Sequence, residues 1–421
     1  MLSAEENERL TRVGPGTPMG ALFRRYWVPF AMSEELSAAD GPPIRVRLLG
    51  EDLVAFRDSG GAVGLVDAFC PHRRAPMFFG RNEEQGLRCV YHGWKFDRAG
   101  TCVDMPSEPP DSLFKTKVRI GSYPTWEGGR MLWAYLGPPE LQPPPPDYEF
   151  LRAPETHRFL AKSYEECNFL QAVEGGLDTA HISFLHNISI KNKNRPRTAD
   201  SAPRLEIERT AYGFRYAGIR QFEDRQYVRT NHYLMPAQQS RGHVIGSDGK
   251  PAPIGTIHGH IWVPIDDTHT YAYSWMYAYD PAQALPPEFV REYESYAGRG
   301  PEALLPGYRP KRNRSNDYLI DRTLQKNDSF TGILGINTQD FAIQEGMGPI
   351  CDRTREHLGT TDRAVIAARQ LLLEAVTAAE NGEPVPGADP ATHRRVRAVD
   401  NYIPKDAAWQ VELEDDMVAK F

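Results

Sequence analysis

The 421-residue sequence has few cysteines, no surplus of basic residues and no long apolar run. Its five cysteines form an odd, sparse set, which argues against a disulfide framework. The 49 basic and 56 acidic side chains leave a formal net charge of −7, so no basic footprint for nucleic acid is present. No apolar stretch approaches the ~18 residues of a membrane span, and the N-terminus lacks the layout of a signal peptide. We therefore expect neither a nucleic-acid nor a membrane partner, and a cytoplasmic location.

A proline-rich stretch divides the chain into two predicted domains. Six prolines fall between Pro138 and Pro146, which is typical of an extended connector. Before it, short alternating runs with Gly-rich turns predict an antiparallel β unit. After it, alternating strands between residues 204 and 280, and helices at 286–298 and 362–382, predict a helix-flanked antiparallel sheet. The expected fold class is α+β, with an antiparallel β domain at residues 1–145 and an α+β domain at residues 146–421.

Two Cys-His pairs occupy the first domain, in CPHRRAPMFFGRNEEQGLRCVYHGW. They are Cys70-x-His72 and Cys89-x-x-His92, and we expect both at hairpin tips. Two thiolates and two imidazoles suit zinc, or a [2Fe–2S] cluster with two Cys on one iron and two His on the other. The ligand types alone leave both open, so a zinc-binding interaction protein is an alternative. The remaining cysteines are expected to be small buried residues: Cys102, Cys167 and Cys351.

The second domain opens with NFLQAVEGGLDTAHISFLH, in a helix predicted at residues 164–185. On such a helix Asp178 and His181 are neighbours on one face, being three apart. His181 and His186 are five apart and diverge by about 140°, so both reach one metal only if the helix widens or ends locally. Two histidines and a carboxylate form the facial triad of non-haem Fe(II) oxygenases. The alternative is a helix with two unrelated histidines.

Together, CPHR…CVYHGW and D-x2-H-x4-H resemble the catalytic α subunit of Rieske non-haem iron oxygenases over nearly the whole chain. The resemblance implies a Rieske [2Fe–2S] cluster in residues 1–145, and mononuclear Fe(II) in residues 146–421. The cluster ligands it implies are Cys70, His72, Cys89 and His92. The iron ligands it implies are His181, His186 and a later aspartate.

For that aspartate the resemblance favours Asp340, in GINTQDFAIQEGMGP, with Glu345 following at the spacing D-x4-E. The competing carboxylates are Asp352, Asp362 and Glu345 itself. The alternative role for Asp340 is a solvated acid at a helix start.

The stretches LTRVGPGTPMGALFRRYW, RNEEQGLRCVYHGWKFD and QDFAIQEGMGPICDRTREHLGTTD resemble the phthalate dioxygenase-like branch. This implies an oxygenase component that uses O2, and electrons from an NADH-dependent flavin and iron–sulfur reductase, to oxidise an aromatic acid. Ring dihydroxylation of the phthalate type and O-demethylation of a methoxylated lignin-derived acid or biaryl both stay open. The alternative from another class is a Rieske electron carrier with a non-catalytic binding domain, which has no use for Asp178, His181, His186 and Asp340.

The resemblance also implies a head-to-tail homotrimer, and leaves open whether two trimers stack. In such a trimer Asp178 joins His181 to a cluster histidine of the neighbouring chain, His72 or His92. We therefore assign Asp178 a catalytic bridging role.

The substrate-binding residues stay unassigned. A carboxylate substrate favours an arginine clamp, but each strand arginine is expected to be solvated. These arginines are Arg204, Arg220, Arg225, Arg229 and Arg241. Four histidines of the strand region lack a ligand spacing and are expected to be structural: His232, His243, His258 and His260.

Overall fold

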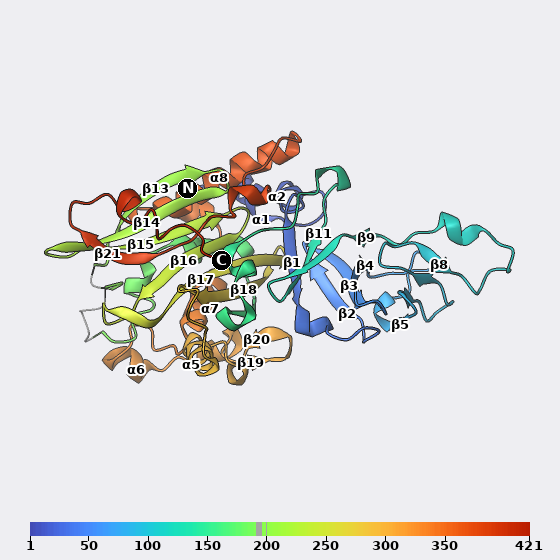
Figure 1. Cartoon of the computed structure of the whole chain (residues 1–421), viewed down its shortest axis with the longest axis horizontal. Helices are drawn as coiled ribbons and strands as arrows, with labels where there is room; N and C mark the ends of the chain where they lie inside the picture. The colour runs from blue at the N-terminus through green and yellow to red at the C-terminus, as the bar shows by residue number, and fades with distance from the viewer. Residues whose placement is uncertain (191–195, 199) are drawn as a thin grey trace. The chain divides into compact units, whose positions relative to one another are not determined.

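The computed structural model describes residues 1–190, 196–198 and 200–421. The chain folds into two compact units, Val13–Pro145 and Met1–Arg12 with Pro146–Phe421. Figure 1 labels their elements. Helix α1 (Ala4–Thr11), which the sequence grouped with the first domain, packs in the second unit, where Arg9 pairs with Glu380 of α8 (Arg363–Glu380) at 2.7 Å.

The smaller unit consists of three antiparallel sheets. Their strand orders are β1-β11-β10, β2-β3-β4-β9 and β5-β6-β7-β8. The strand bounds are β1 (Trp27–Met32), β2 (Ile44–Leu48), β3 (Glu51–Arg57), β4 (Val63–Asp67), β5 (Arg81–Glu83), β6 (Gly86–Arg88), β7 (Lys95–Phe96), β8 (Cys102–Asp104), β9 (Ser122–Tyr123), β10 (Thr125–Gly128) and β11 (Met131–Tyr135). The two-residue alternation that predicted strands is visible in β2, where Val46 and Leu48 are buried while Arg45 and Arg47 are exposed.

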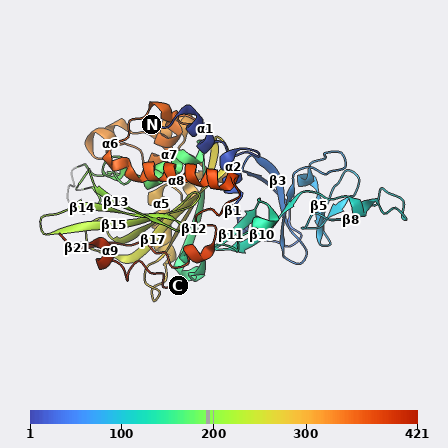
Figure 2. The ribbon, with the colours of Figure 1, turned by 90° about the horizontal axis from the view of Figure 1, so that it is seen from above.

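The larger unit is built on one antiparallel sheet in the order β12-β18-β17-β16-β15-β14-β13, with β21 pairing β15. The strand bounds are β12 (Arg158–Glu165), β13 (Arg204–Thr210), β14 (Gly213–Gln221), β15 (Arg225–Leu234), β16 (Gln238–Ile245), β17 (Pro251–Asp266), β18 (His269–Ala278) and β21 (Asp400–Pro404). In Figure 2, α8 lies on one side of this sheet and α9 (Trp409–Glu412) on the other. The predicted α+β class is confirmed. Within the described residues, every helix is too short or too polar to span a bilayer.

The helix predicted at residues 164–185 is wrong at both ends. Its first residues belong to strand β12, which pairs with β18 through Glu165 opposite Thr270. The helix itself, α4, spans Phe169–Leu177, and its N-cap Asn168 accepts a hydrogen bond from the Leu170 amide. It ends because Asp178 has extended backbone angles and its side chain accepts from the Ala180 amide at 2.7 Å.

A buried ion-pair network connects helix α4 to Arg353 and to helix α8. Glu174 accepts from Arg353 at 2.8 Å and from Arg369 of α8 at 2.6 Å. Burial alone would raise the pKa of Glu174, but the two guanidinium groups outweigh it and lower that pKa. The carboxylate is therefore charged and holds α4 against α8.

We expect Glu174→Ala to lower the free energy of unfolding by about 3–5 kcal/mol, because it leaves two buried guanidinium groups without their shared partner. Urea unfolding followed by tryptophan fluorescence measures this. Because the folded pKa is lowered, the stabilisation is present above the unfolded pKa of the carboxyl group and is lost as the pH falls through the folded one. The exposed pair Arg47–Asp52 is the control, and Asp52→Ala should cost less than about 1 kcal/mol. Equal losses for the two variants would contradict this assignment.

Candidate metal centres

The first centre lies at the tips of two loops in the smaller unit. Cys70 and His72 are on the loop between β4 and β5, and Cys89 and His92 are on the loop between β6 and β7. Each loop is closed at its cysteine, since the Cys70 amide donates to the Ala75 carbonyl at 2.9 Å and the Cys89 amide to the Trp94 carbonyl at 2.8 Å. The loop of Cys89 and His92 is a hairpin tip as predicted, since β6 pairs with β7, whereas the loop of Cys70 and His72 connects strands of two different sheets.

These loops bring the four predicted ligands together. Cys70 and Cys89 are buried in one apolar cluster, and the rings of His72 and His92 lie 4.4 Å apart between centroids. His72 is stacked on Trp94 at 4.3 Å, and its Nδ1 is buried without a hydrogen-bond partner among the described residues. An orphaned imidazole nitrogen beside two buried sulfurs suits a metal centre, where that nitrogen is a ligand.

The acidity of the Cys70 thiol also favours a metal centre. Burial, and then the neighbouring Cys89, raise the pKa of Cys70 to about 11. Two adjacent sulfurs are both held as thiolates when a cation binds them. The donor set therefore fits a [2Fe–2S] cluster.

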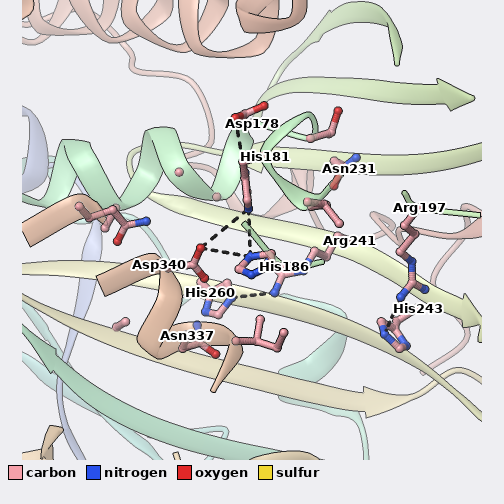
Figure 3. A pocket seen from close by; sticks show the side chains of 18 of the residues that line it. Asp178, His181, His186, Arg197, Asn231, Arg241, His243, His260, Asn337 and Asp340 are labelled. Carbon is pink, nitrogen blue, oxygen red and sulfur yellow. Dashed lines mark hydrogen bonds and ion pairs between the residues drawn. The ribbon is translucent and has the colours of Figure 1, made fainter. Parts of the chain in front are cut away.

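The second centre lies in the larger unit, where α4 ends. His181 is on a short 3-10 helix, His181–Ser183, and Asp340 is on α7 (Ile336–Gly346). The Nε2 atoms of His181 and His186 are 3.1 Å apart, and Asp340 Oδ1 lies 3.8 and 3.2 Å from them. Figure 3 shows the three side chains converging. The sequence allowed two routes to this convergence, and the helix ends locally rather than widening.

Each imidazole has a polar partner at Nδ1, a hydrogen bond for His186 and an ion pair for His181. Gln339 donates through Nε2 to the Ile333 carbonyl, so its Oε1 accepts from His186 Nδ1 at 2.8 Å. Asp178 Oδ2 lies 3.5 Å from His181 Nδ1. Each ring thus presents Nε2 to the common point, as metal-binding histidines do. Asp178 does this as the residue that ends α4, not from within a regular helix as the spacing had suggested.

Two glycines let α4 approach its neighbours closely enough to place these ligands. A Cβ on Gly176 would lie 2.2 Å from the Trp262 ring on β17, and one on Gly175 would lie 2.2 Å from Gln344 on α7. A side chain at Gly176 would have to displace the Trp262 ring, whereas one at Gly175 would displace only the flexible end of Gln344.

Three ligand-type atoms meeting at one point suit a divalent cation. Among the described residues, His181, His186 and Asp340 form the group whose ligand atoms lie within 4.8 Å of one another. Burial would raise the pKa of Asp340, but the two histidines lower it, so the carboxylate is anionic. The competitors lie elsewhere: Asp352 is exposed and caps Thr354, and Glu345 is bound to Tyr318. The set has the composition of a facial triad.

A cavity of about 180 Å³ adjoins this second centre. Its lining includes all three triad residues and polar side chains from β15 and β16, namely Arg229, Asn231, Arg241 and His243. Among the described residues of β18, the one that lines the cavity is Ala272. Figure 3 shows Arg241 and Asn231 between the triad and Arg197.

The expectation that the strand arginines are solvated is wrong for three of them. Arg220 and Arg229 are buried, and Arg241 is partly buried with Nη2 at 2.8 Å from His260 Nε2. Arg220 donates to the Thr179 carbonyl at 2.7 Å, a structural contact beside the His181 turn. Arg204 and Arg225 are exposed as expected.

The sequence pattern of strands β15 to β17 already contains a signal for this polar face. Polar residues recur two apart on three successive strands, at 229 and 231, 241 and 243, and 258 and 260. The register aligns them, with Asn231 opposite Arg241 and Arg241 opposite His258. Since residues two apart share one face of a strand, these pairs line a single buried face. Gln339 and Arg197 gave no comparable signal.

Residues 26–124 match the Rieske [2Fe-2S] domain family, and residues 134–419 match the family described as "LigXa C-terminal domain like". The chain is 40% identical to the phthalate 4,5-dioxygenase oxygenase subunit of Pseudomonas putida, over 97% of this chain and 94% of that protein. It is 33% identical to the 5,5'-dehydrodivanillate O-demethylase oxygenase subunit of Sphingobium sp., over 100% of this chain and 90% of that protein. The structure of NdmA from Pseudomonas putida CBB5 with caffeine has the same fold, with a TM-score of 0.63 at 17% identity over 93% of this chain and 100% of that one.

The chain therefore belongs to the Rieske non-haem iron oxygenases. It is the oxygenase subunit of a multicomponent system, an enzyme whose cofactors are a Rieske [2Fe–2S] cluster and a mononuclear iron. Such a subunit requires dioxygen and a reductase partner. The resemblance stated from the sequence is confirmed.

We expect Asp340→Ala to lower the iron content from about three to about two atoms per chain, because it removes the carboxylate of the triad while leaving the cluster loops intact. Iron analysis together with the visible absorption of the cluster measures this. Asp352→Ala removes an exposed competing aspartate and should keep all the iron. Full iron content in the Asp340 variant would exclude Asp340 as a ligand.

Proposed function

We propose that Cys70, His72, Cys89 and His92 bind the Rieske cluster, and that His181, His186 and Asp340 bind the mononuclear iron. We further propose that the substrate is an aromatic carboxylate. The observation that carries the substrate class is a pair of guanidinium groups in the cavity beside the triad. Arg229 and Arg241 both line it, and neither has a carboxylate within ion-pair distance among the described residues.

Unpaired buried cations are costly, so their presence needs a partner. Burial, and then the charge of Arg197, lower the pKa of Arg229 to about 10. Both groups are still protonated at neutral pH. Arg197 differs because it is paired with Asp400 at 3.1 Å. A substrate carboxylate supplies the missing anion and matches the planar fork of a guanidinium.

The cluster supplies single electrons when bound, and the mononuclear iron activates dioxygen. The residues of the chain position the substrate between the arginines and the triad. The relatives are named for two outcomes, oxidation of phthalate by a dioxygenase and O-demethylation of dehydrodivanillate. Both substrates are aromatic acids, so the clamp serves dihydroxylation and demethylation alike.

Electrons come from NADH through the reductase, in a homotrimer whose chains are arranged head to tail. Each unit has exposed apolar side chains near its candidate metal centre. They support a contact between the smaller unit of one chain and the larger unit of the next. In the smaller unit these are Val90, Tyr91, Leu113 and Phe114, and in the larger unit Phe184, Phe330 and Ile343. The cytoplasmic location stays a prediction.

We expect Arg241→Gln to weaken binding of the substrate acid by about 10- to 100-fold, since a charge-assisted hydrogen bond is lost. A panel of phthalate, chlorobenzoates and methoxybenzoates, followed by oxygen uptake and formaldehyde release, identifies the acid; calorimetry then measures its affinity. Arg225→Gln, on the same strand as Arg229 but exposed, is the matched control and should bind as the wild type does. An unchanged affinity in the Arg241 variant would refute the clamp, and oxidation of neutral arenes in preference to acids would refute the substrate class.

We expect Asp178→Asn to keep both metals but to slow reoxidation of the cluster by about 10- to 100-fold, because an amide cannot replace the carboxylate that orients His181. Stopped-flow absorbance with reduced protein, substrate and dioxygen measures the rate, and light scattering checks for the trimer. Asp224→Asn changes an exposed aspartate and should leave the rate unchanged. A wild-type rate in the Asp178 variant would rule out the bridging role.

A further inference from the structure

In addition to Asp178 and Asp340, a third acidic residue lines the cavity. It has no role in the proposed function. Glu165, the last residue of β12, is 1% exposed and contributes to the cavity wall. It has no basic partner within ion-pair distance among the described residues, unlike the buried acids Glu174 and Glu149. A buried carboxyl group of this kind is stable when it is protonated.

The surroundings of Glu165 are acidic and protic. The Cys167 thiol donates to Glu165 Oε2 at 3.9 Å. Glu345 of α7 accepts from the Glu166 amide at 3.1 Å and from the Tyr318 hydroxyl, so its carboxyl group lies against the end of the same strand. Ser163, on the same strand face as Glu165, is fully buried, and its hydroxyl has no partner among the described residues.

The protonation states agree with this geometry. Burial raises the pKa of Glu165 well above its usual range, and the charges of Glu345 and then Asp340 raise it further. Burial also raises the pKa of Glu345. Both acids therefore keep their proton at a higher pH than a free carboxyl group does. Glu345 is the outer of the two, since its electrostatic neighbours are the partly buried Glu166 and the exposed Arg314.

We propose that Glu165 is the proton donor of the cavity and that Glu345 reloads it from the protein surface. This proposal rests on the proposed function, because it assumes dioxygen reduction at His181, His186 and Asp340. It assigns Glu345 a role other than that of a competing ligand.

The step balances with what the enzyme receives. Oxidation of one aromatic substrate by one dioxygen takes two electrons from the reductase and two protons, whether the product is a diol or a phenol with formaldehyde and water. At each proton transfer the O–H bond of Glu165 breaks and an O–H bond forms on the reduced oxygen. The carboxylate of Glu165 then takes a proton from Glu345, which is reprotonated from solvent.

Infrared spectroscopy of the holoenzyme tests the protonation without turnover. We expect the carbonyl band of a protonated carboxyl group at neutral pH, shifted in D2O and reduced in Glu165→Gln. Glu155→Gln, which changes an exposed acid of the same unit, should leave the band unchanged. An identical band in the Glu165 variant would overturn the proposal.

Kinetics test the transfer. We expect Glu165→Gln to keep its iron content, cluster spectrum and substrate affinity, but to turn over about 100-fold more slowly, with a larger solvent isotope effect. Glu165→Asp should recover part of the rate. Glu345→Gln leaves Glu165 in place and should also slow turnover, which keeps the test open if the first variant does not fold.

Different experimental results would contradict the proposed function and the proton-donor role of Glu165. A wild-type protein that lacks the third iron, or that oxidises no aromatic acid, contradicts the proposed function. An iron-loaded Glu165→Gln variant with the wild-type rate and isotope effect contradicts the proton-donor role alone.

Discussion

The close packing of α4 is the constraint on which the larger unit depends. Gly175 and Gly176 bring this helix against α7 and β17, and a side chain at position 176 would collide with the Trp262 ring. From that fixed point the chain leaves the helix at Asp178 and turns His181 toward α7, which carries Asp340. The triad is thus a product of helix packing, not of a preformed ligand loop.

The buried charges of the larger unit fall into two groups. Those behind α4 and at the C-terminus are matched, as in Glu174 with Arg353 and Glu149 with Arg397. At the cavity, Arg197 is likewise paired with Asp400, but Arg229 and Glu165 lack an opposite charge within ion-pair distance among the described residues. Matched pairs fix the scaffold, whereas unmatched groups are available to molecules that enter.

Motif spacing in the sequence predicted which side chains gather at the two candidate metal centres, because short-range pairs such as Cys70 with His72 depend on local turns. It also predicted the α+β class and the long helix near residues 362–382, where periodicity is strong. It misplaced α4, since pairing of Glu165 with Thr270 overrides local helix preference. The cavity was missed because burial of Arg229 depends on strand register across the whole sheet, which a single strand does not encode.

The two unmatched guanidinium groups link the stability of the enzyme to the ions around it. Arg229 and Arg241 lose part of their hydration when the chain folds, and no carboxylate of the described residues compensates for it. This loss lowers the stability of the folded chain. Any small anion that enters relieves this cost and binds the folded state in preference to the unfolded one. We therefore expect sulfate, phosphate and acetate in a buffer to act as weak surrogate ligands. On the proposed substrate site, they would protect the fold against heat and compete with the substrate.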